Sequence, residues 1–273
     1  MSRLDFAVRL LQEDPTYRVV GSVDRMHLAG LMPLSSGLTL AEGCLRFTAK
    51  DALDLERELD RLNRLLHGAG VWTHWRDERL TLWMEDWSRA LGSIERSAAR
   101  FWGVWTSGAH CNGYVCDKQG RPQGLWIARR SASRPVDPGR LDNLIGCGVQ
   151  ATETAEVALR REAWEEAGLR PESLSEIRQT SIRDVIRPTG SGGLHRQRIH
   201  IFDMELDRQW NPVNQDGEVE SFSLMPIKAV VQALGRGEFA ADAALVTQDF
   251  LARRCSAVET LRRPARPHRL RGA

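Results

Sequence analysis

Leucines recur every three or four positions near the N-terminus, between residues 51 and 68. This spacing places one apolar stripe on a helix, because an α-helix has about 3.6 residues per turn. Thr48 and Asp51 stand where a capping box starts such a helix, and Gly68 can end it. The stripe consists of Leu55, Leu59, Leu62 and Leu66. The pattern predicts an amphipathic helix whose leucines face a core.

Apolar and polar residues alternate in short runs on both sides of this helix. We expect strands at residues 17–23 and 44–47, and a further alternating, aromatic-rich segment at residues 71–83. Residues 1–95 are therefore expected to form a small α+β module. Its tryptophans are interpreted as core and interface residues rather than as a ligand-stacking platform: Trp72, Trp75, Trp83 and Trp87.

The remaining chain mixes helix and strand signals. A short helix is expected at residues 93–101, followed by a hairpin whose strands, 108–116 and 124–130, are joined by turn residues. Further strands are expected at residues 177–185, 197–206 and 219–224, and further helices at 226–234 and 241–253. Strands on both sides of a central helix predict an α/β fold with a mixed sheet sandwiched by helices.

The central helix, whose start Thr152 or Thr154 can cap and which Gly168 can end, differs from the helix at residues 51–68 because carboxylates lie on its apolar side. Glu162, Glu165 and Glu166 fall within an arc of roughly 100°. Earlier residues on the same side are Ala155, Ala158 and Leu159. The alternative is a solvated acidic face, but charges on the inward side of a helix need a partner. A divalent cation such as Mg²⁺ or Mn²⁺, which binds carboxylate oxygens, removes the repulsion among them.

The same segment resembles the signature of the Nudix hydrolase superfamily. That signature reads Gly, five residues, Glu, seven residues, Arg-Glu, an apolar residue, any residue, Glu-Glu, any residue, Gly and an apolar residue. The matching residues are Glu153, Arg161, Glu162, Ala163, Glu165, Glu166, Gly168 and Leu169. Cys147 replaces the first glycine, between Gly146 and Gly148. The resemblance implies the Nudix fold, an α/β/α sandwich with a mixed sheet.

The resemblance also implies roles for these residues. The catalytic, metal-holding acids are Glu162, Glu165 and Glu166. The backbone carbonyl of Gly146 is a further metal ligand. Arg161 anchors the carboxylates, Glu153 pairs with it or with the loop, and Gly168 ends the helix in the left-handed conformation. Cys147 puts the loop geometry in question, because glycine adopts torsions that cysteine adopts only at a cost.

Residues outside the signature are candidates for the chemistry or for the substrate. Glu218 lies where many Nudix enzymes place a further acid that serves as metal ligand or general base, with Glu220 as the competing choice. Arg129 and Arg130 end a hairpin strand, so one of them faces the phosphate side of the sheet; a surface salt bridge is the alternative.

His110 and Asn112 share one face of the strand at residues 108–116. Their placement is compatible with recognition of a base ring in the substrate. A histidine satisfied within the core is the alternative, because both side chains can also bond to neighbouring protein groups. The sequence leaves both interpretations open.

The chain further resembles one Nudix subgroup, the thiamine pyrophosphokinase-related proteins with an N-terminal extension. The matching segments are residues 74–78, 94–96, 108–115, 126–131, 138–143 and 216–220. This resemblance implies hydrolysis of thiamine diphosphate, and especially of its oxidised forms, to the monophosphates. Hydrolysis of another nucleoside-diphosphate-linked compound is the alternative. A non-catalytic Nudix domain that senses a ligand is a second alternative.

Composition bounds the number of domains and the classes of partner. The 273 residues are 42% hydrophobic and 27% charged, which suits a globular chain with one large or two small domains. We expect an N-terminal extension at residues 1–95, a hydrolase domain at 96–252 and a disordered Arg/Pro-rich tail at 253–273. The formal net charge of +2 gives no reason to expect nucleic-acid or membrane partners.

Location and cysteine usage follow from the same composition. No signal peptide and no apolar run long enough to cross a membrane is visible, so we expect a cytoplasmic protein whose partner is a small-molecule diphosphate. The five cysteines are scattered and lack metal-binding spacing, so we expect free thiols. The oligomeric state is left open by the sequence.

Overall fold

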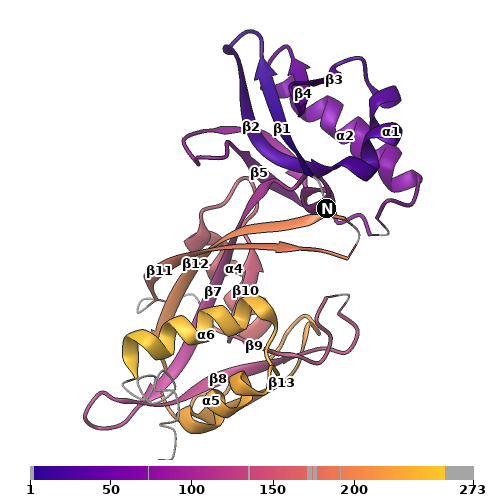
Figure 1. Cartoon of the computed structure of the whole chain (residues 1–273). Coiled ribbons are helices and arrows are strands. Elements are labelled where there is room, and N and C mark those ends of the chain that lie inside the picture. The colour runs from indigo at the N-terminus through magenta and orange to yellow at the C-terminus, as the bar shows by residue number, and fades with distance from the viewer. Residues whose placement is uncertain are drawn as a thin grey trace, which may run out of the picture. The chain divides into compact units, whose positions relative to one another are not determined.

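The structure is a computed structural model that describes residues 3–72, 74–134, 136–170, 174, 177–190 and 192–255. Two compact units are present (Figure 1). The first unit comprises the described residues of Met1–Ala109, Cys147–Ala158 and Ile182–His200. The second unit comprises those of His110–Gly146, Leu159–Ser181 and Ile201–Ala273. Each unit is described by itself below.

A four-stranded sheet begins the first unit, in the order β2-β1-β4-β3. Its strands are β1 (Arg3–Leu10), β2 (Asp14–Asp24), β3 (Leu38–Ala41) and β4 (Cys44–Ala49). β1 is antiparallel to β2 and parallel to β4. The strands expected at residues 17–23 and 44–47 are confirmed. β1 is not among the predicted strands, although it alternates: Leu4, Phe6, Val8 and Leu10 are buried, and the charged residues between them are more exposed.

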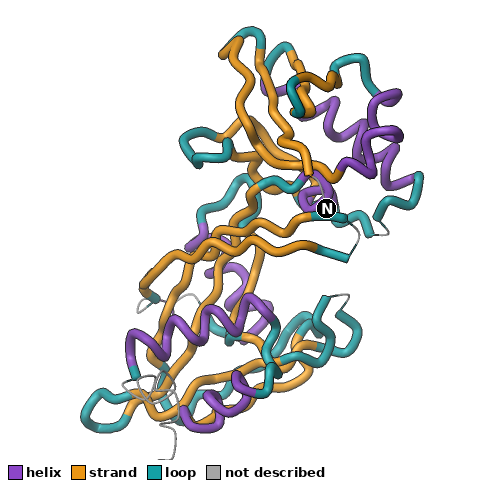
Figure 2. Tube along the Cα trace, viewed as in Figure 1, coloured by secondary structure: helices purple, strands orange, loops and turns teal. Residues whose placement is uncertain are grey.

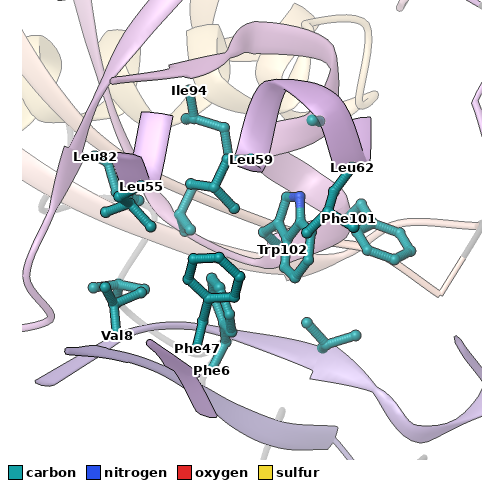
Figure 3. Packing of buried hydrophobic residues seen from close by; sticks show 14 of the residues in the cluster. Phe6, Val8, Phe47, Leu55, Leu59, Leu62, Leu82, Ile94, Phe101 and Trp102 are labelled. Atoms are coloured by element: carbon teal, nitrogen blue, oxygen red, sulfur yellow. The ribbon is translucent and has the colours of Figure 1, made fainter. Parts of the chain in front are cut away.

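The helix α2 (Ala52–Gly68) carries the leucine stripe of this unit. Asp51 caps it, because its carboxylate accepts a hydrogen bond of 2.9 Å from the Asp54 N–H. Figure 3 shows the leucines of this helix facing Phe6 and Phe47 across the core. Leu55, Leu59 and Leu62 are fully buried. The predicted helix and its inward stripe are confirmed.

A hairpin and several short helices complete the N-terminal part of this unit. The hairpin pairs β5 (Arg79–Trp83) with β6 (Ala90–Glu95) in antiparallel fashion. The short helices are η1 (Arg25–His27), α1 (Leu28–Leu31), η2 (Met32–Leu34), η3 (Arg96–Ala98) and α3 (Ala99–Trp102). The helix expected at residues 93–101 is wrong in its first part. Glu95 ends β6 and its carboxylate caps η3 through the Ser97 N–H, so helical structure begins only after it.

A seven-stranded sheet follows, with β11-β12-β7-β8-β13 in order, β10 paired with β7, and β9 paired with β8. Its strands are β7 (Trp105–Cys116), β8 (Pro122–Arg130), β9 (Leu141–Asp142), β10 (Ile145–Gly148), β11 (Arg178–Pro188), β12 (Leu194–Glu205) and β13 (Val219–Pro226). The predicted hairpin is confirmed as β7 and β8 (Figure 2). Asp117 holds its turn by accepting hydrogen bonds from two backbone N–H groups.

Two helices pack on this sheet in the second unit, namely α5 (Ile227–Gly235) and α6 (Ala241–Arg254). Val230 of α5 and Phe250 of α6 are fully buried in one cluster with Leu125 and Ile127 of β8. The expected helices at residues 226–234 and 241–253 are confirmed. The predicted α/β fold with a mixed sheet and flanking helices is confirmed as well.

Three further expectations concern the C-terminal tail, the cysteines and membrane-spanning helices. Residues 256–273 of the expected tail lie outside the described residues. The five cysteines are free, as expected. Among the described residues, no helix is both long and apolar enough to cross a membrane.

Candidate functional site

The helix α4 (Ala155–Ala167) carries the acidic signature. Thr154 caps its start, because the Thr154 hydroxyl accepts a hydrogen bond of 3.2 Å from the Val157 N–H. Its end is set by Gly168, whose φ of 68° lies in the left-handed region. The Gly168 N–H donates to the Trp164 carbonyl, which satisfies one of the last acceptors of the helix. Both ends of the helix therefore match the sequence expectation.

The three glutamates of this helix differ in exposure. Glu166 is buried, with 7% of its surface exposed. The side chain of Glu162 is mostly covered, whereas that of Glu165 is 46% exposed. Arg161 bonds to both of the latter, at 2.7 Å to Glu162 and 3.5 Å to Glu165. The carboxylate that points inward is thus Glu166.

Glu166 is connected directly to the loop that precedes the helix. Its Oε2 accepts a hydrogen bond of 2.9 Å from the backbone N–H of Gly146. Burial raises the pKa of Glu166 well above its ordinary value, and the negative charges of Glu162, Asp142 and Asp216 raise it further, against the lowering effect of the Gly146 bond. A cation beside this carboxylate would relieve that cost.

The Gly146 position is tightly packed, whereas Cys147 is not strained. A Cβ atom on Gly146 would lie 3.0 Å from two atoms of the His110 ring, so a side chain there would require the ring to shift by a few tenths of an ångström. Cys147 lies within β10, and it is not among the non-glycine residues with positive φ. Its replacement of the signature glycine therefore requires no left-handed backbone.

A pocket in the second unit collects charged groups around Glu166. It is lined by Ala128, Arg130, Arg134, Asp142, Asn143, Gly146, Glu166, Glu218 and Val219. Three acids and two arginines therefore share one small concavity. Of the sequence-based candidates, the pocket brings together Gly146, Glu166, Glu218 and Arg130, and its lining does not include Glu162, Glu165, Arg129, His110 or Asn112.

The two candidate arginines at the end of β8 have different surroundings. Arg130 pairs with Asp142 at 2.6 Å and also donates to the Val136 carbonyl. Arg129 donates instead to the Gly139 carbonyl at 2.7 Å. Successive residues of a strand point to opposite faces, which is why only one of these two arginines reaches the pocket.

Glu218 is held in the pocket by its backbone and by its side chain. Its carbonyl accepts a hydrogen bond of 2.9 Å from the Ser131 N–H, and its own N–H donates to Asp216. Its carboxylate forms an ion pair with Arg134. The competing candidate, Glu220, is exposed in β13 and does not line the pocket.

His110 and Asn112 lie in a buried polar network of the second unit. Asn143 donates to the Asn112 side chain at 3.2 Å and to the Thr247 hydroxyl at 3.0 Å, so its oxygen is left to accept from His110 Nδ1 at 2.9 Å. Asn112 donates in turn to Asp203 at 3.0 Å. These bonds are internal to the protein, and a role of either residue in substrate recognition stays a prediction.

Sequence reasoning did not single out three residues of the pocket: Arg134, Asp142 and Asn143. Asp142 and Asn143 could have been found from the polar pair that follows Leu141. Asp142 ends the two-residue strand β9, Asn143 follows it, and both are buried. A buried acid next to a buried amide is unusual unless both bond to protein or ligand groups. Arg134 has no comparable sequence signal.

The donor chemistry of the site fits a hard divalent cation, since its groups are carboxylates and backbone carbonyls. Within the described part of the chain, no three His, Cys, Asp or Glu side chains are already gathered around one point. Glu166 provides the fit, because it is a buried carboxylate whose ionisation is opposed by three neighbouring acids. A metal ion would turn that repulsion into coordination.

Comparison with known proteins assigns the family. The NUDIX domain model matches residues 108–249, which is more than half of the chain. The chain therefore belongs to the Nudix family, as the signature predicts. The uncharacterized protein YJR142W of Saccharomyces cerevisiae is similar to it, with 30% identity over 77% of this chain and 65% of the yeast protein. The thiamine-related subgroup stays a prediction.

Further relatives carry the family name. Nudix hydrolase 20, chloroplastic, of Arabidopsis thaliana is 35% identical over 59% of this chain and 42% of the plant protein. The chain thus spans less than two thirds of the length of the yeast and plant relatives. The crystal structure of DR0079 from Deinococcus radiodurans, at 25% identity and a TM-score of 0.46, covers 63% of this chain and 98% of that one.

Proposed function

We propose that this protein is a metal-dependent hydrolase that cleaves a diphosphate linkage. The observation that carries the proposal is Glu166, a buried carboxylate bonded to the Gly146 N–H and placed in a pocket with both acids and arginines. Acids suit metal ions and arginines suit phosphate oxygens, so their combination in one concavity suits a metal-bound diphosphate. The family assignment supports the same reaction class.

The proposed metal ligands are the glutamates of α4, Glu162, Glu165 and Glu166, together with the Gly146 carbonyl. Mg²⁺ or Mn²⁺ bound there would neutralise phosphate oxygens and lower the pKa of a bound water. Arg161 holds two of the glutamates on the helix surface through charge-assisted hydrogen bonds. The third glutamate, Glu166, is held by the hydrogen bond that the Gly146 N–H donates to it.

Other residues of the pocket would handle the proton and the phosphate. Glu218 is the proposed general base or further ligand, supported by its place in the pocket wall. Arg130 lies in the same wall and is the better placed of the two neighbouring arginines for phosphate contact. In the overall reaction, water adds to the terminal phosphorus and the bond between that phosphorus and the bridging oxygen breaks. The monophosphate leaves with the bridging oxygen, the terminal group becomes inorganic phosphate, and a proton of the water passes to the general base.

The proposed substrate is thiamine diphosphate or one of its oxidised derivatives, which would yield the monophosphate and phosphate. This part of the proposal is supported by the sequence resemblance to the thiamine-related subgroup. The proposed hydrolase domain is residues 96–252, which include the matched family segment. Residues 1–95 are proposed to form the extension that the subgroup carries.

Phosphate release from a panel of compounds tests the proposal. The panel contains thiamine diphosphate, its oxidised derivatives, nucleoside diphosphates and dinucleotides, each with Mg²⁺ and with Mn²⁺. We expect turnover of the thiamine compounds that stops when EDTA is added. Turnover of nucleotide compounds alone would redirect the substrate assignment. Binding without turnover of any compound would favour a ligand-sensing domain.

A further inference from the structure

Two guanidinium groups line the pocket, and they are held in different ways. Arg130 is built into the wall, with Nη1 on Asp142 at 2.6 Å and both Nε and Nη2 on the Val136 carbonyl, at 3.2 and 3.1 Å. Arg134 instead forms an ion pair with Glu218. The side chains of that pair are 21% and 41% exposed, so solvent and solutes reach it.

The backbone keeps these two charges together even without their ion pair. The Ser131 N–H donates to the Glu218 carbonyl at 2.9 Å, and the Arg134 N–H donates to the Ser131 carbonyl at 3.1 Å. On the other side, the Glu218 N–H donates to Asp216 at 2.8 Å. The two side chains can therefore separate while their main chains stay in place.

The charges in the pocket favour separation of Arg134 from Glu218 when a diphosphate binds. The lining contains three acids, Asp142, Glu166 and Glu218, and a diphosphate adds further negative charge. A partly exposed ion pair contributes little net stability, so an anion with several oxygens can displace one carboxylate from it. The planar fork of an arginine binds phosphate oxygens through two parallel N–H groups.

We propose that Arg134 is a phosphate-binding residue and that an entering diphosphate displaces Glu218 from it. The inference rests on the proposed function and extends it to the order of events in the pocket. Glu218 is released beside the substrate only when the substrate is bound, and its carboxylate is then available as a base or ligand. The ion pair is thus the resting state of the acid.

Binding of methylenediphosphonate, a diphosphate analogue that is not hydrolysed, tests the exchange in the full chain by calorimetry in EDTA. Arg134→Gln should weaken binding about ten- to hundredfold, because a charge-assisted contact is lost. Glu218→Gln should strengthen binding several-fold by removing the competitor. In the double variant Arg134→Gln/Glu218→Gln, that strengthening should disappear, which simple removal of negative charge does not predict.

Matched controls and a second arginine variant complete the design. Arg121→Gln and Glu238→Gln change exposed residues that do not line the pocket, and should leave binding unchanged. Arg134→Lys keeps the charge without the fork and should give intermediate affinity. Unchanged affinity in folded Arg134→Gln would overturn the inference, as would a Glu218→Gln effect that persists in the double variant.

The outcome is separable from that of the proposed function. If the wild-type protein hydrolyses a diphosphate while Arg134→Gln leaves its KM unchanged, the inference fails and the proposed function stands. If the wild-type protein hydrolyses nothing but binds the analogue through Arg134, the proposed function fails and the inference stands.

Discussion

Two helices of this protein each bury one side, but they bury opposite chemistry. α2 places leucines against the core of the first unit, and Leu55, Leu59 and Leu62 are fully buried there (Figure 3). α4 continues a buried apolar side, formed by residues such as Ala163, into the buried acid Glu166. The same helical periodicity thus buries leucines in one helix and an acid beside apolar side chains in the other.

The difference separates stability from function. A buried leucine gains free energy simply by leaving water. A buried carboxylate loses its hydration and requires a compensating partner, so its place in the fold is explained only by what it binds. Function is therefore indicated where the buried pattern of α4 changes from apolar to acidic. Substitutions in the two helices test this separation.

Leu59→Ala should lower the free energy of unfolding by about 2–5 kcal/mol, because it removes a fully buried side chain and leaves a cavity. Leu53 lies on the same helix but is 61% exposed, so Leu53→Ala is the matched control, with an expected change within about 0.5 kcal/mol. Chemical denaturation of the full chain measures both. Equal effects of the two substitutions would mean that the α2 stripe does not form the core.

Glu166→Gln should reduce hydrolysis by about 10²–10³-fold, because the amide keeps the shape but cannot neutralise a metal ion. Its free energy of unfolding in metal-free buffer should not fall, since a buried charge is removed. Glu156→Gln, at an exposed position in the first turn of α4, should retain activity. Steady-state kinetics and denaturation are compared. A parallel loss of stability and activity would instead assign Glu166 a structural role.

The stability of the metal-free protein should depend on pH through the same residue. Burial raises the pKa of Glu166 above 4.5, so the folded protein retains a proton that the unfolded chain releases. This contribution to stability is fully present below pH 4.5 and is lost as pH rises through the raised pKa. The Tm difference between wild type and Glu166→Gln, in EDTA from pH 4.5 upward, measures it. A constant difference would contradict the raised pKa.

Local signals explain which parts of the fold could be predicted from sequence. The helix α2 has a regular stripe and a cap, and the β7–β8 hairpin has a turn built around Asp117. β1 has a local signal of the same kind, because its buried residues Leu4, Phe6, Val8 and Leu10 alternate with more exposed charged ones, so its absence from the prediction is an oversight and not a limit of the sequence. The end of β6 was wrongly predicted as helix, because Glu95 was placed inside a helix, whereas its carboxylate caps the start of η3.

The candidate site could be predicted where a signature or a strand end marks its residues, as for Glu218 and Arg130 besides the acidic segment. Glu166 follows from the acidic signature, and its partner Gly146 lies at the start of the same signature. Asp142 and Arg134 come from β9 and from a loop, and no periodicity connects them to α4. Their approach to Glu166 depends on strand pairing in the sheet, which a single sequence does not specify.

Cys147→Gly restores the glycine of the family signature and should produce the smallest change, with activity within about twofold of wild type. The reason is that Cys147 already lies in the extended strand β10, without positive φ. Stability should fall by about 0.5–1 kcal/mol, because glycine loses more backbone freedom on folding and the buried thiol is removed. Kinetics and thermal unfolding of the two proteins measure both quantities. A large gain in activity would show instead that the cysteine distorts the loop at Gly146.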